Sequence, residues 1–206
     1  MIVGFEGLNG VGKSTMAKKF AKEFGYKYIS RPIYNVFGAD DNYLGVEYKV
    51  ATQVEDKIYN KKNNYELKAC LTGLGLLYVH KVMNNENLVI DRDLLSNFSY
   101  NGTNESLPLF EAFFKMGVYP DITFLLYASK DEIIKRIIKR NPNDSDLTDE
   151  DVVNQSYEKI LKFVNLYEIP AIIIDTTEKS EEQVFEEIKM KYLEVVEKNG
   201  NFKSSG

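Results

Sequence analysis

Apolar residues along the chain follow two different spacings. Short, nearly continuous apolar runs are typical of strands buried on both faces of a parallel sheet, and such runs, with one alternating segment, occupy residues 2–6, 26–30, 88–91, 122–127 and 171–174. Apolar residues separated by three or four positions predict helices, which we expect at residues 13–24, 47–59, 65–83, 107–116, 130–140, 148–167 and 180–197. Residues 34–41 are expected to form an ordered loop.

This alternation of strands and helices predicts an α/β fold, in which a five-stranded parallel sheet is flanked by helices on both faces. The pattern contains no internal repeat and no linker. Residues 1–198 are therefore expected to form a single domain, and residues 199–206 a flexible tail.

The composition favours a cytoplasmic protein. The formal net charge is −5, and basic residues are interleaved with acidic ones, which argues against nucleic acid as a partner. No apolar run reaches the ~20 residues of a membrane span, and the first residues lack the pattern of a signal peptide. Because Cys70 is the only cysteine, we expect neither an internal disulfide nor a cysteine zinc cluster.

The sequence GLNGVGKS at residues 7–14 has the spacing of a phosphate-binding loop, and it stands between a predicted strand and a predicted helix. Such a loop needs glycine because its backbone N–H groups point inward around a phosphate, where side chains would block the approach. Lys13 would supply a cation to the outer phosphates. The residues expected to bind ATP are Gly7, Asn9, Gly10, Val11, Gly12, Lys13, Ser14 and Thr15.

A metal site is expected beside this loop. Asp91 follows the buried run at 88–90, at the expected carboxyl end of a central strand. In proteins with such a loop, an aspartate in this place and the loop hydroxyl hold magnesium. Ser14 and Asp91 are therefore the expected metal ligands, and ATP and Mg²⁺ the expected cofactors.

The remaining motifs favour a kinase among the nucleotide-binding proteins. The chain lacks the Asp-x-x-Gly and Asn-Lys-x-Asp motifs of GTPases, and the nearest string is NKKN at residues 60–63. A kinase needs arginines that neutralise the moving phosphoryl group and a lid that excludes water. Arg136 and Arg140 share one face of a helix that leads into the polar segment 141–147, and they are the expected lid residues.

Four segments resemble the motifs of the thymidylate kinase family, whose close relatives are the deoxynucleoside kinases. The strings FEGLNGVGKST, VIDRD, YPDITFLLYASKDEIIKRIIKR and AIIIDTTEKSEEQV occur in the order and spacing of that family over nearly the whole chain. The resemblance implies a single P-loop kinase domain with a short lid, often a homodimer, that transfers a phosphoryl group from ATP to a small-molecule nucleotide. It also implies that Arg31 binds the acceptor phosphate and that Arg92 binds either this phosphate or the transferring group. Lys13 and Arg92 would then act in catalysis with Arg136 and Arg140.

A nucleoside monophosphate is the favoured acceptor, and a nucleoside is the alternative. A nucleoside hydroxyl needs a general base, but no carboxylate follows the second strand until Asp40 and Asp41. A monophosphate is already an anion and needs a cationic clamp instead, which Arg31 and Arg92 would provide. A nucleotide-binding regulator with little catalysis is a further alternative, because residues that would recognise a base are missing.

The departures from the family pattern lie mainly on the acceptor side. The segment LTGLGLLYVH contains no arginine, although the family places a base-reading arginine there, and Asn9 stands where Asp or Glu is usual. Gly10 replaces the phosphate-loop arginine of some members, so the lid would supply that charge. Asn9 is also expected to face the acceptor, and Tyr34 and Phe37 are candidate surfaces on which its base could stack.

The helix that contains this segment is otherwise expected to be structural. The spacing of Leu71, Leu74 and Tyr78 predicts that these side chains belong to the core. His80 follows the same apolar stretch without a visible acidic partner, so a structural role is expected for it. Thr148 and Ser180 are expected to cap the last two helices.

Overall fold

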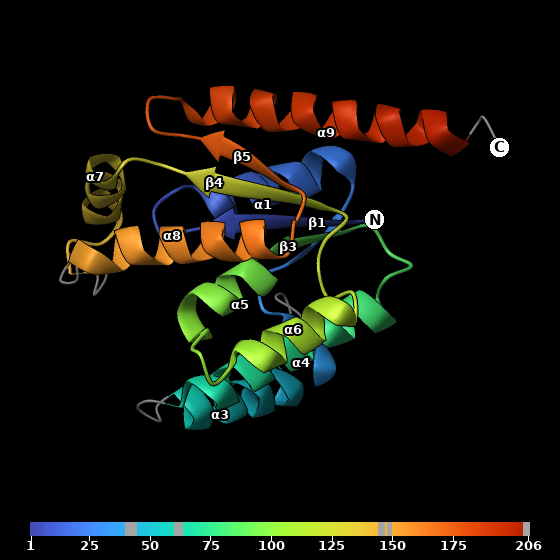
Figure 1. The fold of residues 1–206 in the computed structure, drawn as a ribbon, viewed down its shortest axis with the longest axis vertical. Helices are drawn as coiled ribbons and strands as arrows, with labels where there is room; N and C mark the ends of the chain where they lie inside the picture. The colour runs from blue at the N-terminus through green and yellow to red at the C-terminus, as the bar shows by residue number, and fades with distance from the viewer. Residues whose placement is uncertain (40–44, 60–63, 144–146, 148–149, 204–206) are drawn as a thin grey trace.

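The computed structural model describes residues 1–39, 45–59, 64–143, 147 and 150–203. Five parallel strands form one sheet in the order β2-β3-β1-β4-β5, which lies at the centre of the molecule (Figure 1). The strands are β1 (Ile2–Gly7), β2 (Lys27–Ile29), β3 (Leu88–Asp91), β4 (Ile122–Tyr127) and β5 (Ala171–Asp175). The predicted α/β fold with a five-stranded parallel sheet is confirmed.

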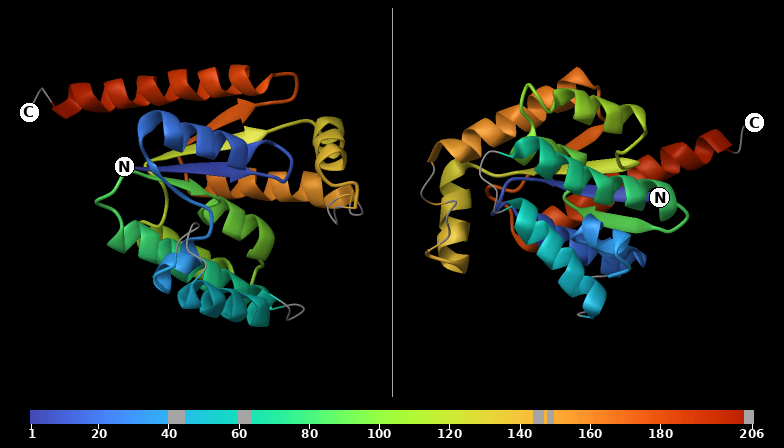
Figure 2. Two further views of the ribbon diagram at one scale, coloured as in Figure 1. Left: turned by 180° about the vertical axis from the view of Figure 1, so that it is seen from behind. Right: turned by 90° about the horizontal axis from the view of Figure 1, so that it is seen from below.

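Helices cover both faces of the sheet (Figures 1 and 2). Helices α1 and α9 lie on one face, and α5 and α8 lie on the other, with α4 packed outside α5. Within the described residues the helices are α1 (Lys13–Phe24), α2 (Pro32–Val36), α3 (Val46–Tyr59), α4 (Tyr65–Val82), α5 (Leu94–Asn101), α6 (Leu107–Lys115), α7 (Lys130–Arg140), α8 (Glu150–Leu166) and α9 (Glu181–Lys203).

The order of the strands brings the residues of the sequence motifs to one edge of the sheet. Strand β1 lies between β3 and β4, so the direction in which the chain adds strands reverses there, and ligands bind at such a point outside the carboxyl ends of the strands. The register pairs Phe5 with Asp91. This pairing sets Asp91 beside the start of the loop that follows β1.

Two short helices differ from the sequence-based prediction. Helix α2 occupies part of the expected loop at residues 34–41, because Pro32 at its first turn already has a helical φ. Helix α5 was not predicted, since the side chains it buries include Ser96, Asn97 and Ser99, and its pattern is therefore not amphipathic. Helix α9 continues to Lys203 and so includes part of the expected tail.

The core predicted for α4 is also partly wrong. Leu71 is buried, but Leu74 is 48% exposed, because α4 turns Gly73, Gly75 and Leu76 toward the molecule instead. Among the described residues, no helix is long and apolar enough to cross a membrane. The predictions for Asp40, Asp41, the NKKN string and Thr148 concern residues outside the described ranges.

Gly75 allows α4 to approach the start of α2, and we expect Gly75→Ala to destabilise the protein. An added Cβ would lie 2.3 Å from the backbone nitrogen of Ile33, and backbone cannot move aside as a flexible side chain can. The expected loss in the free energy of unfolding is about 1–3 kcal/mol, measured by urea denaturation.

Glu66→Gln, at an exposed position of the same helix, is the matched control, and it should change stability by less than about 0.5 kcal/mol. A Gly75→Ala variant as stable as the wild type would show that α2 and α4 are not in this close contact.

Candidate active site

The loop after β1 has the backbone that phosphate binding requires. Gly7, Gly10 and Gly12 have φ values of 130°, 81° and 96°, which side chains disfavour. A Cβ at Gly7 would also lie 2.3 Å from the backbone oxygen of Leu126. Gly12 is the N-cap of α1 without a side-chain cap, so the first N–H groups of the helix remain available to an anion.

Helix α7 packs directly on this loop. A Cβ at Gly10 would lie 3.1 Å from the Ile137 side chain and 3.2 Å from the Ile133 backbone oxygen. A larger residue at position 10, such as the arginine of some relatives, would push α7 away. The glycine therefore allows the helix that carries Arg136 and Arg140 to approach the loop.

Lys13 is buried beneath the loop. Its Nζ donates a hydrogen bond to the Leu8 backbone oxygen at 2.6 Å, and only 4% of the residue is exposed. Burial, together with the positive charges of Arg92 and Arg140, lowers the pKa of Lys13 to about 7. Added negative charge at the loop would stabilise the protonated form of this amine.

Asp91 has one carboxylate oxygen in use and one without a partner. Its Oδ2 accepts a hydrogen bond from the Tyr28 hydroxyl at 2.9 Å. Its Oδ1 is buried and has no hydrogen-bond partner among the described residues. A buried polar atom without a partner lowers the stability of the fold, and a ligand that pairs with Oδ1 would remove this cost.

The residues at this place fit a magnesium ion. Ser14 is exposed at the start of α1, so its hydroxyl is accessible. The described residues contain no group of three or more His, Cys, Asp or Glu that could hold a metal. Mg²⁺ is commonly held by one or two protein ligands together with nucleotide phosphates and water. Ser14 and Asp91 are sufficient for a site of this kind.

Arg92 lies between the phosphate loop and α5. It has a φ of 77°, and its backbone N–H donates to the Phe5 oxygen at 3.1 Å. Its guanidinium group donates to Asn9 Oδ1 and to the Tyr100 hydroxyl (3.1 Å), and it lies over the Tyr100 ring. The amide of Asn9 thus holds the arginine from the loop side.

Glu6 binds the start of α5 from within the core. It is fully buried, its Oε1 accepts the backbone N–H groups of Asp93 (2.9 Å) and Ser96 (3.2 Å), and its Oε2 accepts the Ser96 hydroxyl. Burial, with a contribution from the Asp93 carboxylate, raises the pKa of Glu6 to about 7. These bonds fix the backbone on the far side of Arg92.

His80 has an acidic partner that the sequence analysis did not identify. Its Nε2 lies 2.7 Å from Asp93 Oδ2, and Asp93 Oδ1 accepts the Leu94 N–H and caps α5. Burial lowers the pKa of His80, but the Asp93 carboxylate outweighs this effect, so the pKa lies above its usual value. The signal available in the sequence was the position of Asp93, an N-cap residue before two leucines.

A cavity of about 150 Å³ lies between the end of β2 and helices α3 and α4. Arg31 and Arg92 both line it, and Glu55, Tyr59 and Thr72 are among the other lining residues. The sequence analysis missed Glu55, because α3 brings it to the cavity from a distant part of the chain.

Tyr34 does not provide the expected stacking surface. Its ring is fully buried, and its hydroxyl accepts a hydrogen bond from Arg31 and donates one to Glu55 Oε2 at 3.0 Å. The Arg31 guanidinium also lies over the Tyr34 ring, 5.1 Å from its centre. Phe37 is partly buried against the small apolar cluster under α2 and α3. Tyr34 therefore orients Arg31 instead of exposing a ring to a ligand.

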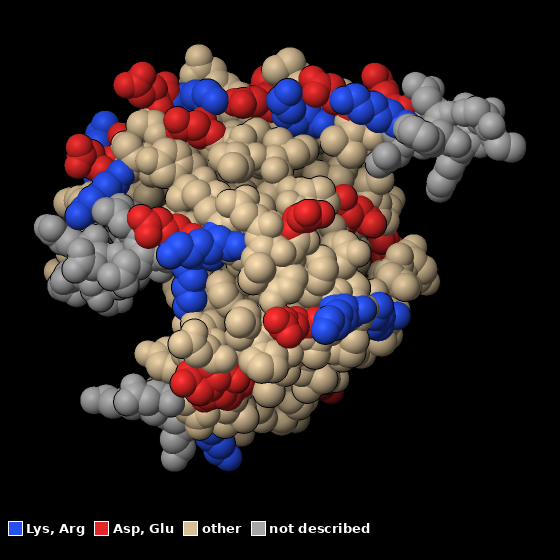
Figure 3. Space-filling view, in the orientation of Figure 1, with Lys and Arg blue, Asp and Glu red and all other residues tan. Residues whose placement is uncertain are grey.

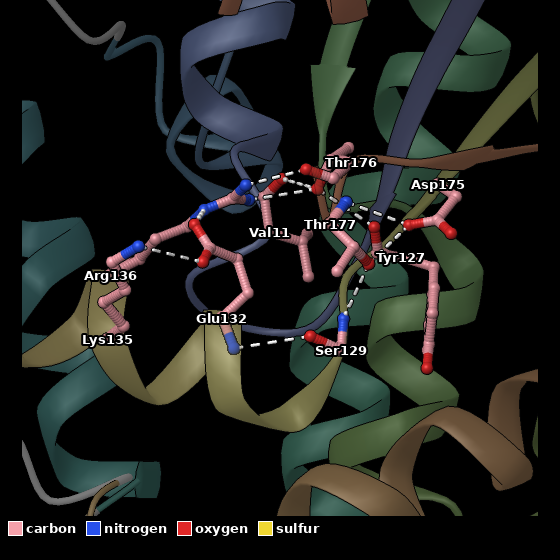
Figure 4. A network of polar contacts seen from close by, with 9 residues as sticks. All are labelled: Val11, Tyr127, Ser129, Glu132, Lys135, Arg136, Asp175, Thr176 and Thr177. Atoms are coloured by element: carbon pink, nitrogen blue, oxygen red, sulfur yellow. Dashed lines mark hydrogen bonds and ion pairs between the residues drawn. The ribbon is translucent and has the colours of Figure 1, made fainter. Parts of the chain in front are cut away.

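A larger cavity of about 370 Å³ lies on the other side of the phosphate loop, and Gly12, Thr15 and Arg136 line it. Figure 4 shows that Arg136 donates to Glu132 Oε1 (2.8 Å) and to both the hydroxyl (3.0 Å) and the backbone oxygen (2.7 Å) of Thr176. Arg136 is thus bound to the segment after β5. Arg140 is exposed, and it is the arginine of this pair whose charge contributes to the lowered pKa of Lys13.

The surface is hollowed on one side. In Figure 3 the left edge of the molecule recedes beside the place where Figure 1 shows α5, below α8 and above α3. Basic and acidic residues are interspersed on the face that is shown, without a patch of one sign.

Comparison with known proteins agrees with this geometry. A family model described as thymidylate kinase matches residues 5–188. The chain belongs to the thymidylate kinase family. The kinase predicted from the sequence is thereby confirmed: this member of the family is a phosphotransferase that phosphorylates a nucleoside monophosphate with ATP.

Relatives with assigned functions match over most of their length. The probable thymidylate kinase of Methanococcus maripaludis is 27% identical over 195 residues, covering 89% of this chain and 90% of that protein. The thymidylate kinase of Mycoplasma mobile is 26% identical, and the match covers 80% of this chain and 84% of that protein.

Solved structures share the fold of this thymidylate kinase family member. The thymidylate kinase from Candida albicans superposes with a TM-score of 0.66 at 17% identity, covering 97% of this chain and 92% of that one. A deoxyadenosine kinase from M. mycoides gives a TM-score of 0.65 at 22% identity, covering 94% and 100%. Nucleotide and nucleoside kinases therefore share this architecture, and the fold alone does not distinguish their acceptors.

We expect ATP binding to be accompanied by proton uptake at Lys13. Because the free amine has a pKa of about 7 and bound phosphates favour its charged form, uptake should be about half a proton at pH 7 and nearly one at pH 8. Isothermal titration calorimetry in buffers of different ionisation enthalpy measures this uptake.

Lys13→Arg is the matched control, since arginine is charged throughout this pH range. Its proton uptake should be smaller and should not increase between pH 7 and pH 8. Equal uptake by the variant and the wild type would assign the proton to a different group.

Glu6→Gln should flatten the pH dependence of stability. Between pH 4.5 and about 7 the unfolded chain has lost the Glu6 proton while the folded protein keeps it. The stability of the wild type should therefore fall as the pH rises through this range, by on the order of 3 kcal/mol from this group. Urea unfolding at several pH values measures the slope.

His80 contributes a slope of the same sign, since stability from a raised histidine pKa is full at low pH and is lost as the pH rises through that pKa. The part of the pH dependence that comes from His80 should persist in Glu6→Gln. A variant with the full slope of the wild type would mean that Glu6 is ionised in the folded protein.

Proposed function

We propose that this site transfers the γ-phosphoryl group of ATP, with Mg²⁺, to the phosphate of a nucleoside monophosphate bound by Arg31 and Arg92. The observation that carries the proposal is that these two arginines, from the ends of β2 and β3, line one cavity at the same edge of the sheet as the phosphate loop. A monophosphate needs such a clamp to approach another anion, whereas a neutral nucleoside does not.

The donor side follows from the loop. Backbone N–H groups at Gly7 to Gly12 and the start of α1 would surround the phosphates of ATP, with Asn9, Val11, Ser14 and Thr15 as the other loop contacts. The cavity of about 370 Å³ beside Gly12 and Thr15 would hold the nucleoside of ATP. Arg136 lines this cavity while bonded to Thr176, which supports a contact with that nucleoside.

The remaining roles concern charge. Ser14 and Asp91 would hold Mg²⁺, which supplies neutralisation of the phosphate oxygens when bound. Lys13 and Arg92 both contact the loop, at Leu8 and Asn9, and would balance the charge that moves during transfer. Arg140, exposed at the end of α7, would close over the same group as part of a lid.

One observation favours a nucleoside as an additional acceptor. Glu55 lines the acceptor cavity, so a carboxylate is present there although none follows β2 directly. The expected homodimer and cytoplasmic location stay predictions. The exposed apolar residues Leu67, Leu74 and Val82 on α4 support the homodimer.

Turnover of natural acceptors tests the proposal. The purified protein should convert at least one nucleoside monophosphate to its diphosphate with ATP and Mg²⁺, detected by anion-exchange chromatography. Arg31→Met should raise the KM for this acceptor about 10- to 100-fold, because a charge-assisted contact is lost, and change the KM for ATP little.

Arg31→Lys is the control that keeps the positive charge. Its KM for the acceptor should lie between the values of the wild type and Arg31→Met. Turnover of nucleosides but not of monophosphates would assign the chain to the nucleoside kinases. Absence of transfer to any acceptor would favour a nucleotide-binding regulator.

A further inference from the structure

We propose that Glu55 binds the 3′-hydroxyl of the acceptor sugar and so selects acceptors that carry it. This inference rests on the proposed function, because it concerns the same acceptor cavity. It adds a specificity-determining residue on α3, a helix that none of the sequence motifs includes.

The carboxylate of Glu55 is fixed in position. Its Oε2 accepts the Tyr34 hydroxyl at 3.0 Å and lies 3.8 Å from a terminal nitrogen of Arg31. The Tyr34 hydroxyl in turn lies 3.2 Å from the Thr52 hydroxyl, one turn of α3 earlier. Both contacts are made to Oε2, so they hold this oxygen and leave Oε1 to other partners.

That other oxygen is available to a ligand. Glu55 lines the acceptor cavity, and Oε1 accepts no hydrogen bond from the residues that the structure describes. An ionised carboxylate can only accept hydrogen bonds. The group that binds here must therefore be a donor, which excludes the phosphate and the carbonyl oxygens of a base.

The position along the cavity identifies the donor. Arg31 and Arg92 mark the end that takes the phosphate, and Glu55 lies next to Arg31, within 3.8 Å. Tyr59 lies one turn further along α3, and its hydroxyl is 2.7 Å from that of Thr72 on α4. A nucleotide with its phosphate at the arginines has its sugar beside Glu55 and its base beyond, near this pair of hydroxyls.

A sugar hydroxyl is also the donor that every natural acceptor shares. Amino groups occur on some bases and are absent from others, whereas ribose and 2′-deoxyribose both carry the 3′-hydroxyl. A site that provides a hydrogen bond for such a group rejects the analogue that lacks it, because its own polar atom is left unpaired.

A comparison of two acceptors in two enzymes tests this role. The acceptors are the best 2′-deoxynucleoside monophosphate from the screen and its 2′,3′-dideoxy counterpart. Wild type should prefer the deoxy acceptor about tenfold or more in kcat/KM. In Glu55→Ala the ratio should fall to within about threefold, through loss of activity on the deoxy acceptor alone.

Two further variants complete the test. Glu55→Gln keeps an oxygen that can accept a hydrogen bond from the hydroxyl, but it loses the negative charge. Its ratio of kcat/KM for the two acceptors should therefore be intermediate. Glu66→Gln, an exposed carboxylate in the first turn of α4, should keep the wild-type ratio. Because each ratio is taken within one protein preparation, a loss of folded enzyme cancels.

The alternative outcomes are distinct. An equal loss on both acceptors in Glu55→Ala would show that Glu55 only orients Arg31, and an unchanged ratio would show no role in selection; either result overturns the inference. Turnover of nucleosides but not of monophosphates, or no turnover at all, would instead overturn the proposed function.

Discussion

The buried carboxyl group of Glu6 joins the two segments from which the site is made. Glu6 directly precedes the phosphate loop. Its carboxyl group accepts hydrogen bonds from the backbone N–H groups of Asp93, the residue after Arg92, and of Ser96 in α5. Burial of such a group is unfavourable without hydrogen bonds, so the loop, the start of α5 and Arg92 are set relative to one another by one set of contacts. The pairing of Phe5 with Asp91 in the sheet adds the proposed metal ligand to the same unit.

The sequence predicted the sheet well because a buried parallel strand has a local signature. Continuous apolar runs indicated four of the strands and an alternating segment indicated β2, and β4 has the predicted bounds, 122–127. Helix α5 was not predicted, because several of its buried side chains are polar. The Asn97 amide donates a hydrogen bond to the Ala69 backbone oxygen of α4, and the Asn101 amide donates one to Asn97. Such a helix is stabilised by specific partners, and a hydrophobic pattern carries no information about them.

The residues of the site also fall into two groups: those that a local sequence pattern indicates, and those whose contacts depend on tertiary packing. The sequence could indicate the loop glycines and Asp91 because the roles proposed for them depend on near neighbours in the chain and on the end of a strand. The contacts of Arg92 with Asn9 and Tyr100, and those of Glu55, depend on how separate elements meet. The spacing of residues within α3 or α5 cannot specify that, so Tyr34 was given a ligand-facing role although tertiary packing buries it.

The backbone of Arg92 sets stability and activity against each other. A non-glycine residue in the left-handed conformation costs roughly 1–2 kcal/mol, and Arg92 adopts it with a φ of 77°. Glycine would relieve this cost and leave the backbone bonds on either side intact, but it would remove the guanidinium group from the cavity proposed to bind the acceptor. Selection for thermostability alone would therefore tend to discard this arginine, and a stabilised form of the enzyme has to gain its stability elsewhere.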